Sequence, residues 1–198
     1  NSSIQNLIFG KDHDAIQSGR VSTIQTPGGS GGLCIAAHLI LRSNRKTKVW
    51  LSNPSWPNHY PLLKLAGLSL EQYPYYNYQN HSIDFISLLS AVEKMNQGDL
   101  ILLHGCCHNP SGSDFSMEQW KELGYLLKKK KVIPFIDLAY LGLGDGIDKD
   151  AFGVRFMAEI LPELIVVSSC SKNFGLYRER VGAVSVVSEN KDIADLTL

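Results

Sequence analysis

The sequence lacks any excess of one charge. Its 198 residues include 19 basic and 19 acidic side chains, which gives a formal net charge of zero. Without a net positive field, attraction to nucleic acid or to an anionic membrane is not expected. The apolar runs are also far shorter than the roughly 20 residues that cross a bilayer, and the first residues do not resemble a signal peptide. We therefore expect neither nucleic-acid nor membrane partners.

Cysteine is scarce as well. The sequence contains four cysteines, and none of them forms a Cys-x-x-Cys pair. This number and spacing exclude a disulfide-stapled scaffold and favour reduced thiols in a cytoplasmic protein. The hydrophobic fraction of 44% is ordinary for a globular chain, and the length suffices for one large domain.

A polar stretch, residues 169–180, follows an apolar run that predicts a buried strand. Lys172 therefore lies just past the carboxyl end of a strand, where open α/β sheets place their sites. An amine attacks a carbonyl only when it is neutral, a form that burial and cationic neighbours favour. Ser169 and Arg180 suit a phosphate, because a guanidinium can donate two parallel hydrogen bonds to its oxygens. The stretch indicates a carbonyl compound that carries a phosphate.

The same residues admit two other interpretations. Ser169 and Lys172 fit the Ser-x-x-Lys motif of penicillin-binding acyl enzymes. Those enzymes also need Ser-Asp-Asn and Lys-Thr-Gly motifs, and the nearest match here, residues 46–48, lacks the glycine. The third interpretation is a plain surface loop between strands.

A glycine-rich turn, residues 28–32, precedes the apolar segment 33–41, which we predict to be a helix. Free backbone N–H groups and the positive end of the helix dipole would face an anion there. No Gly-Lys-Ser/Thr follows, so the turn is not a Walker motif. By itself, such a turn is weak evidence for a ligand.

The remaining pattern alternates short apolar strands with amphipathic helices, which is typical of an α/β fold. The loop 172–180 is too short for a crossover helix, which needs a dozen or more residues. The strand after it should therefore run antiparallel within an otherwise parallel sheet. Residues 1–27 show little periodicity and are interpreted as the end of a preceding unit. We expect strands at 48–52, within 68–76, and at 100–104, 132–137, 164–168 and 181–187. We expect helices at 33–41, 84–94, 120–131 and 150–161, and from 191 onward, with Asp84 as one cap and Ser116 and Gln119 as a capping box.

The strand 100–104 ends in a cluster of possible metal ligands. Strand alternation places His104, Cys106 and His108 on one side, an arrangement that would suit zinc. Neighbours along one extended strand rarely converge on a metal, however, and no fourth ligand is evident. We therefore predict no metal site.

Two further residues, Asp137 and Trp56, each admit more than one interpretation. Asp137 ends a predicted strand, and a buried carboxylate is costly unless a positive charge pairs with it. A pyridinium nitrogen is such a partner, as in pyridoxal chemistry. Trp56 lies between two prolines, where a large ring either joins the core or covers something.

Together these motifs resemble the class I pyridoxal-phosphate aminotransferases, in the aspartate and aromatic branch. The resemblance rests on residues 28–32, 56–59, 108–112, 137–140 and 169–180, and extends over about residues 9–190. Gly32 departs from it, because alanine is more usual at that position. The resemblance implies that Lys172 forms an imine with pyridoxal 5'-phosphate, that Asp137 pairs with the ring nitrogen, and that Tyr140 acts on the phenolic oxygen. It implies cofactor contacts by Gly29, Ser30, Gly31, Trp56, Asn109, Ser169 and Arg180, with His59 and His108 behind them.

The resemblance also implies a fold and an activity. The fold would be a three-layer α/β sandwich whose mostly parallel sheet carries one antiparallel strand. Residues 1–198 would form most of the large, cofactor-binding domain of a homodimer. The activity would move an amino group between aspartate or an aromatic amino acid and a 2-oxo acid, and the arginines that bind substrate carboxylates would lie outside this chain. The alternative is a non-catalytic pyridoxal-sensing domain of a transcription regulator.

Overall fold

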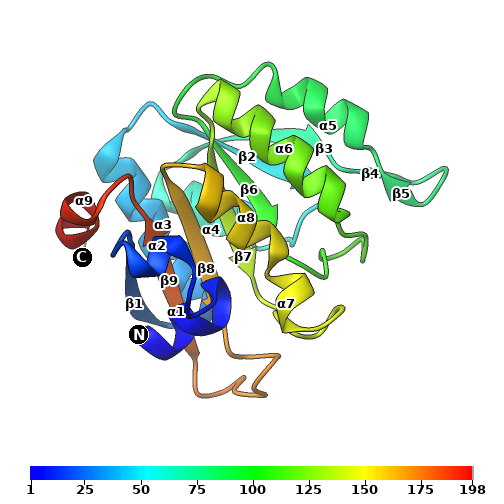
Figure 1. The fold of residues 1–198 in the computed structure, drawn as a ribbon. Coiled ribbons are helices and arrows are strands. Elements are labelled where there is room, and N and C mark those ends of the chain that lie inside the picture. The colour runs from blue at the N-terminus through cyan, green and yellow to red at the C-terminus, as the bar shows by residue number, and fades with distance from the viewer. Residues whose placement is uncertain (198) are drawn as a thin grey trace.

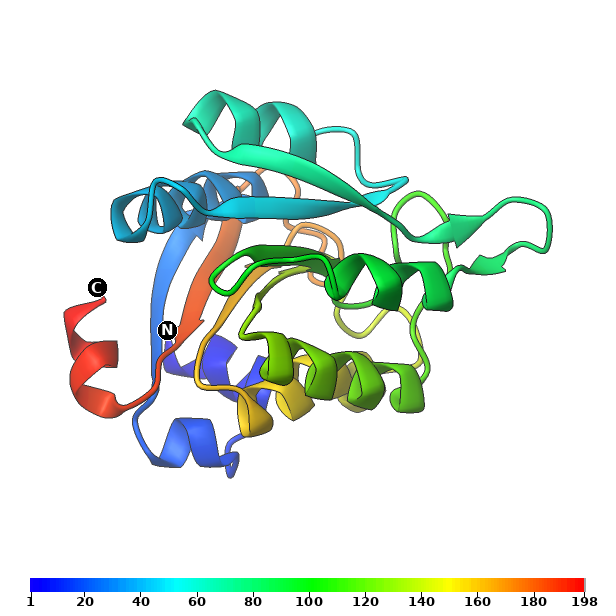
Figure 2. The same cartoon turned by 90° about the horizontal axis from the view of Figure 1, so that it is seen from above.

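The computed structural model describes residues 1–197 and shows an α/β fold of three layers (Figure 1). A twisted sheet forms the middle layer. Helices α3 and α4 cover one face, and α1, α2, α5, α6 and α8 cover the other, as the view from above shows (Figure 2). This arrangement confirms the predicted three-layer sandwich. No helix within residues 1–197 has the length and apolar character needed to span a membrane.

The main sheet has seven strands within residues 1–197, in the order β1-β9-β8-β7-β6-β2-β3. Strand β9 is antiparallel to both of its neighbours, and the other pairs are parallel. The single antiparallel strand follows from the short loop before it and confirms the prediction. The strands are β1 (Val21–Pro27), β2 (Lys48–Asn53), β3 (Ser69–Pro74), β6 (Leu100–His104), β7 (Ile133–Leu138), β8 (Leu164–Ser169) and β9 (Val181–Val187).

The helices begin and end near their predicted positions, with two differences. Helix α3 starts at Gly28, so the glycine turn is itself the first helical turn. The expected helix at 150–161 is α8, and a separate short helix, α7, precedes it. The helices are α1 (Ser2–Phe9), α2 (Asp14–Gln17), α3 (Gly28–Ser43), α4 (His59–Ala66), α5 (Phe85–Val92), α6 (Met117–Lys130), α7 (Ile147–Asp150), α8 (Phe152–Ile160) and α9 (Lys191–Leu196).

The predicted caps are present. Asp84 accepts a hydrogen bond from the backbone of Ser87, 3.2 Å away, at the start of α5. Ser116 and Gln119 form a reciprocal capping box at the start of α6. Each arrangement satisfies N–H groups that have no partner inside the helix.

Residues 1–27 show little periodicity in the sequence, yet they are part of this fold. They form α1, α2 and an edge strand, β1, which pairs with β9 along its whole length. The sequence hides this strand because polar side chains face its buried side. Thr23, for example, is 2% exposed and shares a 2.8 Å hydrogen bond with Ser185 on β9. A small hairpin, β4 (Tyr76–Asn77) with β5 (Ser82–Ile83), was also not predicted; it projects from the body (Figure 2).

Two apolar clusters fill the space between the layers. One lies under α3 and α4 and contains Leu33, Leu102 and Val167; the other lies under α5, α6 and α8 and contains Leu103 and Val166. Successive residues of β6 and β8 thus face opposite clusters, which explains why these strands read as continuous apolar runs. The packing holds the carboxyl ends of β6, β7 and β8 side by side.

Candidate active site

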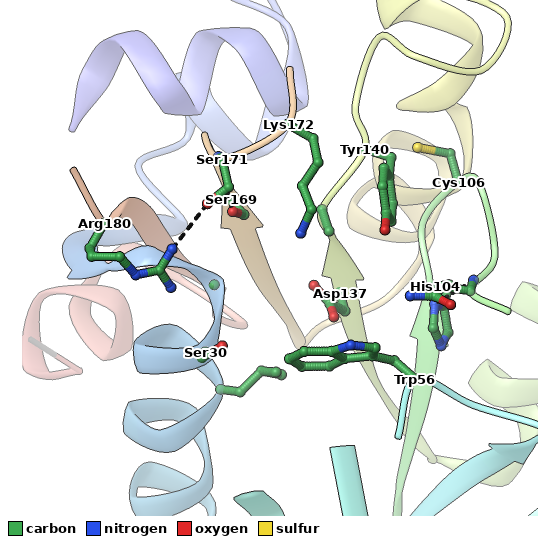
Figure 3. A pocket seen from close by; sticks show the side chains of 14 residues that line it. Ser30, Trp56, His104, Cys106, Asp137, Tyr140, Ser169, Ser171, Lys172 and Arg180 are labelled. Carbon is green, nitrogen blue, oxygen red and sulfur yellow. Dashed lines mark hydrogen bonds between the residues drawn. The ribbon is translucent and has the colours of Figure 1, made fainter. Parts of the chain in front are cut away.

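A pocket opens at the carboxyl ends of β6, β7 and β8 (Figure 3). The pocket is partly open to solvent. Its position at the strand ends is the usual one for ligands of open α/β sheets. The pocket is lined by Gly29, Ser30, Leu33, Trp56, His104, Cys106, Asn109, Asp137, Ala139, Tyr140, Ser169, Ser171, Lys172 and Arg180.

Lys172 projects its amine into the middle of this pocket (Figure 3). It lies in the loop that leaves β8, and its Nζ is 5.3 Å from the centre of the Tyr140 ring. Tyr140 lies in the loop that leaves the neighbouring strand β7. The two loops therefore bring an amine and a phenol to the same wall.

Asp137 forms the floor between these groups. Its side chain, on β7, is only 9% exposed, and its Oδ2 accepts a 2.9 Å hydrogen bond from His59 Nε2. His59 is fully buried at the start of α4. A carboxylate that is buried but still lines a cavity is well placed to pair with a cationic group of a ligand.

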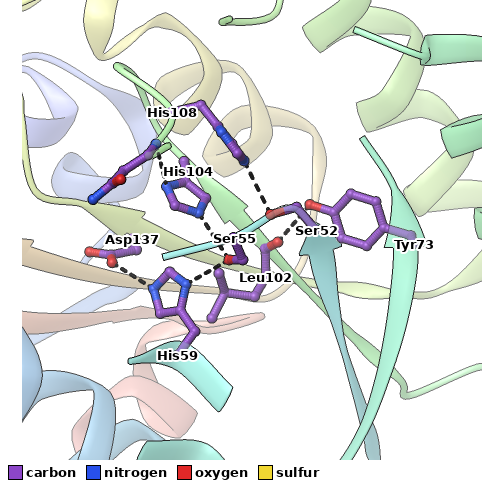
Figure 4. Close-up of polar contacts among 9 residues, drawn as sticks. Ser52, Ser55, His59, Tyr73, Leu102, His104, His108 and Asp137 are labelled. Carbon is purple, nitrogen blue, oxygen red and sulfur yellow. Dashed lines mark hydrogen bonds and ion pairs between the residues drawn. The ribbon is translucent and has the colours of Figure 1, made fainter. Parts of the chain in front are cut away.

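A chain of hydrogen bonds extends behind Asp137 (Figure 4). His59 Nδ1 lies 2.9 Å from Ser55 Oγ, which lies 3.2 Å from His104 Nε2. Burial lowers the pKa of His104 well below its ordinary value, so this ring is neutral. Its Nδ1 accepts from the backbone N–H of Asn109, 3.4 Å away.

The neutral His104 ring fixes which atom donates in each of these hydrogen bonds. A neutral imidazole that accepts at one nitrogen carries its proton on the other, so His104 donates to Ser55. Ser55 then donates to His59, which leaves His59 to donate to Asp137. These hydrogen bonds therefore present a donor, rather than a second acceptor, to the Asp137 carboxylate.

His108 supports the loop after β6 from behind the pocket. Its ring stacks on Tyr75 at a centroid distance of 3.9 Å and shares hydrogen bonds with Ser52 (3.1 Å) and Ser111 (2.8 Å). Burial lowers the pKa of His108 to about 4. A neutral His108 thus anchors the turn that carries Asn109.

The opposite end of the pocket suits an anion. Helix α3 starts there with Gly28, Gly29 and Ser30, and its first N–H groups have no partners within the helix. Arg180 points to the same end and donates to Ser171, 3.3 Å away (Figure 3). A Cβ at Gly28 would lie 2.5 Å from Arg180 Nη2, so glycine is what lets the guanidinium approach the helix.

Trp56 bounds the side of the pocket opposite the Lys172 amine (Figure 3). Its ring makes an edge contact with His59 at 5.2 Å. It is therefore neither a plain core tryptophan nor a free surface ring. A flat ligand above Asp137 would have this indole on one side.

Most of the site residues that the sequence suggests come together in this pocket. Gly31, His59 and His108 do not line it: the two histidines lie behind it, and the space beside Gly31 is filled by Pro27, 2.6 Å from an added Cβ. Within residues 1–197, no group of three or more His, Cys, Asp or Glu side chains is arranged to hold a metal. Leu33, Ala139 and Ser55 were not predicted as site residues. Ser55 lies between the same two prolines as Trp56, which was the only signal for it.

The chain matches a known protein family. The sequence model of the family described as aminotransferase class I and II matches residues 1–197. The aspartate aminotransferase of Haemophilus influenzae is 46% identical over 198 residues, which cover 100% of this chain and 50% of that protein. The aromatic-amino-acid aminotransferase of Pseudomonas aeruginosa is 43% identical over 186 residues, which cover 94% of this chain and 46% of that protein. The chain thus spans about half the length of these curated relatives.

Solved structures agree with this match. An aromatic amino acid aminotransferase from Burkholderia cenocepacia superposes with a TM-score of 0.98 at 42% identity, over 100% of this chain and 50% of that one. The aromatic-amino-acid aminotransferase of Burkholderia pseudomallei, solved covalently bound to pyridoxal phosphate, also has a TM-score of 0.98, at 41% identity. That superposition covers 100% of this chain and 49% of the other.

Proposed function

Because the chain belongs to the class I and II aminotransferase family, we propose that it forms the cofactor-binding part of an aspartate or aromatic amino-acid aminotransferase. One observation carries the proposal. A lysine amine, a buried carboxylate and an arginine at a helix N-terminus surround one pocket, at Lys172, Asp137 and Arg180. Relatives named for both substrate classes are similar to the chain over 94–100% of its length.

The pocket fits pyridoxal 5'-phosphate as its cofactor. The phosphate would lie at the start of α3, against Ser30, Ser169 and Arg180, where N–H groups, hydroxyls and a guanidinium converge. The glycine at position 28, beside which a Cβ would meet Arg180 at 2.5 Å, keeps that cradle open. Bound there, the cofactor supplies an aldehyde that bonds to amines and a ring that withdraws electrons from the substrate's Cα.

Asp137 would hold the proton on the ring nitrogen. Its carboxylate is buried and receives a donor from His59 on the side away from the pocket. The opposite charges then attract in a poorly solvated site, where such pairs are strong. A protonated ring withdraws electrons better than a neutral one.

Lys172 would serve first as the residue that bonds to the cofactor's aldehyde carbon and then as a base. When not bonded to the cofactor, its Nζ would act as a general base that holds and moves the proton of the substrate's Cα. Its position in the middle of the pocket suits this transfer (Figure 3). Such transfer requires a distance of roughly 3 Å, which the flexible lysine stem can reach.

Three residues would hold the ring in place and tune its oxygen. Trp56 lies on the side opposite Lys172 and would stack on the ring (Figure 3). Asn109 and Tyr140 line the same pocket and would donate to the phenolic oxygen. The hydrogen bonds from His104 through Ser55 would fix the tautomer of His59, which lies at the other end of the cofactor ring.

We also propose the setting in which the site works. Residues 1–198 would form most of the large domain of a cytoplasmic homodimer that uses amino-acid and 2-oxo-acid substrates. The four cysteines are free, in keeping with a reducing compartment. The half-length coverage of the relatives supports a substrate site completed by further parts of the protein.

A substrate screen tests the function. The full-length protein, loaded with pyridoxal phosphate, would be given aspartate, tyrosine or phenylalanine with 2-oxoglutarate as acceptor, and glutamate formation would be measured. We expect turnover with at least one of the three donors and none in Lys172→Ala. Absence of turnover with every donor, in a protein that binds the cofactor at Lys172, would favour the pyridoxal-sensing alternative.

A further inference from the structure

Tyr140 and Lys172 lie on separate loops, beyond the last residues of their strands. Strand β7 ends at Leu138 and β8 at Ser169, so the ladder between these strands does not place either side chain. The loops must therefore set their separation, which is 5.3 Å from Nζ to the ring centre. Catalytic geometry tolerates errors of only about 0.5 Å, so something must hold these loops.

The loop after Tyr140 is folded around one carboxylate. Asp150, at the end of α7, accepts hydrogen bonds from the backbone N–H groups of Gly142 (2.8 Å), Gly144 (3.0 Å) and Asp145 (2.8 Å). We call this set of contacts the loop clamp. Three bonds to one side chain fix a stretch that has no regular secondary structure of its own.

Glycines make the loop clamp possible. A Cβ at Gly144 would lie 2.7 Å from Asp150 Oδ1, closer than a Cβ atom comes to a neighbouring heavy atom. Gly142 and Gly146 have φ angles of +90° and +104°, which side chains with a Cβ rarely adopt. The loop sequence and the carboxylate are therefore fitted to each other.

Burial of the Asp150 carboxylate is energetically unfavourable unless other contacts compensate for it. Its exposed fraction is 7%, and no ion pair involves it within residues 1–197. A buried charge without a counter-ion persists only when hydrogen bonds replace its water. Here the recorded bonds come from the loop that follows Tyr140, so the carboxylate and that loop stabilise each other.

Asn173 joins the clamped loop to the lysine loop. It follows Lys172 directly, and its Nδ2 donates to the carbonyl oxygen of Leu141, 3.3 Å away. Its Oδ1 is buried and has no hydrogen-bond partner among the described residues. Burying an amide with one group unpaired is energetically unfavourable. The hydrogen bond to Leu141 is therefore the interaction by which the Asn173 side chain stabilises these loops.

We propose that Asp150 and Asn173 are positioning residues that set Tyr140 against Lys172. Asp150 acts through the backbone of the clamped loop, and Asn173 through Leu141. Neither side chain lines the pocket. The proposal rests on the proposed function, because it assigns these residues a role in placing the donor to the cofactor's phenolic oxygen.

The absorbance of the cofactor reports this placement without any turnover. The linkage between Lys172 and the cofactor changes colour when its nitrogen loses a proton. In that form the phenolic oxygen no longer receives the linkage N–H, so it depends more on Tyr140 as a donor. Displacing Tyr140 should therefore raise the pH midpoint of the colour change, as Tyr140→Phe should also do.

The test uses Asp150→Asn and Asn173→Ala in the full-length, cofactor-loaded protein. We expect each to raise the midpoint by about 0.5 to 1 pH unit, the size expected for one lost hydrogen bond. Asp148→Asn is the matched control, since it removes the same charge from α7 at a side chain that is 89% exposed. Asn173→Ala keeps the test decisive if Asp150→Asn does not fold.

A double-mutant cycle separates positioning from general destabilisation. On a Tyr140→Phe background, neither variant should move the midpoint further, because the donor is already absent. A midpoint unchanged in both single variants, or shifts that persist in full on the Tyr140→Phe background, would overturn the proposal. A wild-type protein without a pH-dependent band would instead contradict the proposed function itself.

Discussion

The Asp137 carboxylate shows how a single residue is prepared for its ligand. It faces the pocket on one side and the His59 N–H, 2.9 Å away, on the other. The direction of that bond follows from the neutral state of His104, three hydrogen bonds away. The hydrogen bonding of one buried carboxylate thus depends on neighbouring side chains that do not line the same face of the pocket.

Replacing Asp137 by asparagine should separate catalysis from folding. An amide keeps the shape and can still accept from His59, but it has no charge to hold the ring proton. We expect turnover in the full-length protein to fall by about a hundredfold or more, with a melting temperature close to that of the wild type. Turnover near the wild-type value would show that another group pairs with the ring nitrogen.

Gly32 is a second residue whose neighbours explain it. A Cβ there would lie 2.7 Å from Val167 Cγ1, a stiff side chain on β8. We expect Gly32→Ala to lower the free energy of unfolding by about 1–2 kcal/mol, because overpacking outweighs the gain in helix propensity. Thermal or urea unfolding would measure the loss.

A partner substitution checks the cause. Val167→Ala should make room, so the double variant should be more stable than the sum of the two single changes predicts. The matched control is Val166→Ala, because Val166 is equally buried but faces the other cluster. Equal coupling energies for Val166 and Val167 would exclude the contact as the reason for glycine at position 32.

At the scale of elements, the position of α3 decides where an anion can bind. Its first residue, Gly28, packs directly on Gly182 of β9. A Cβ at Gly182 would lie 2.7 Å from the carbonyl carbon of Gly28 and 2.6 Å from the Ser168 oxygen. Backbone atoms on both sides leave no side chain that could move aside.

Gly182→Ala should therefore displace the start of α3. We expect lower stability, by about 1–3 kcal/mol, together with weaker binding of pyridoxal phosphate. Val181→Ala, at the half-buried residue before it, should affect stability with little effect on cofactor binding. Unfolding curves and a titration with the cofactor would provide both values; unchanged cofactor affinity in Gly182→Ala would contradict the role given to this contact.

The elements also show what the sequence could and could not reveal. Apolar runs such as β6 and β8 predicted the central strands, and the short loop 172–180 predicted the antiparallel β9. Strand β1 was missed because its inward residues are polar and become satisfied only by pairing with β9 and α9, far away in the sequence. The hydrogen bonds from His104 through Ser55 to His59, and the loop clamp, were missed for the same reason. Their partners come from separate segments, such as 55–59 and 104–109, which only the fold brings together.

At the scale of the whole molecule, buried neutral histidines link stability to pH. His108 has a pKa lowered by burial from 6.5 to about 4, and the pKa of His104 is lowered as well. At pH values between about 4 and 6.5 the unfolded chain binds more protons than the folded one. The free energy of unfolding therefore decreases as the pH falls below about 6.5. Above that pH the contribution is fully present.

His108→Gln should flatten this dependence. Glutamine does not titrate, so the loss of stability between pH 6.5 and 5 should become smaller. His38→Gln, at an exposed histidine on α3, should leave the slope unchanged. Urea unfolding at several pH values would measure the slopes, and equal slopes in wild type and His108→Gln would show that His108 is not the titrating group.

The central claim is that this pocket binds pyridoxal phosphate through Lys172. The direct measurement is borohydride reduction of the full-length, cofactor-treated protein, followed by digestion and mass mapping of its lysines. The account predicts one pyridoxyl group on the peptide that contains Lys172, and its loss in Lys172→Arg. A label on a different lysine, or no label in protein that is otherwise folded, would contradict it.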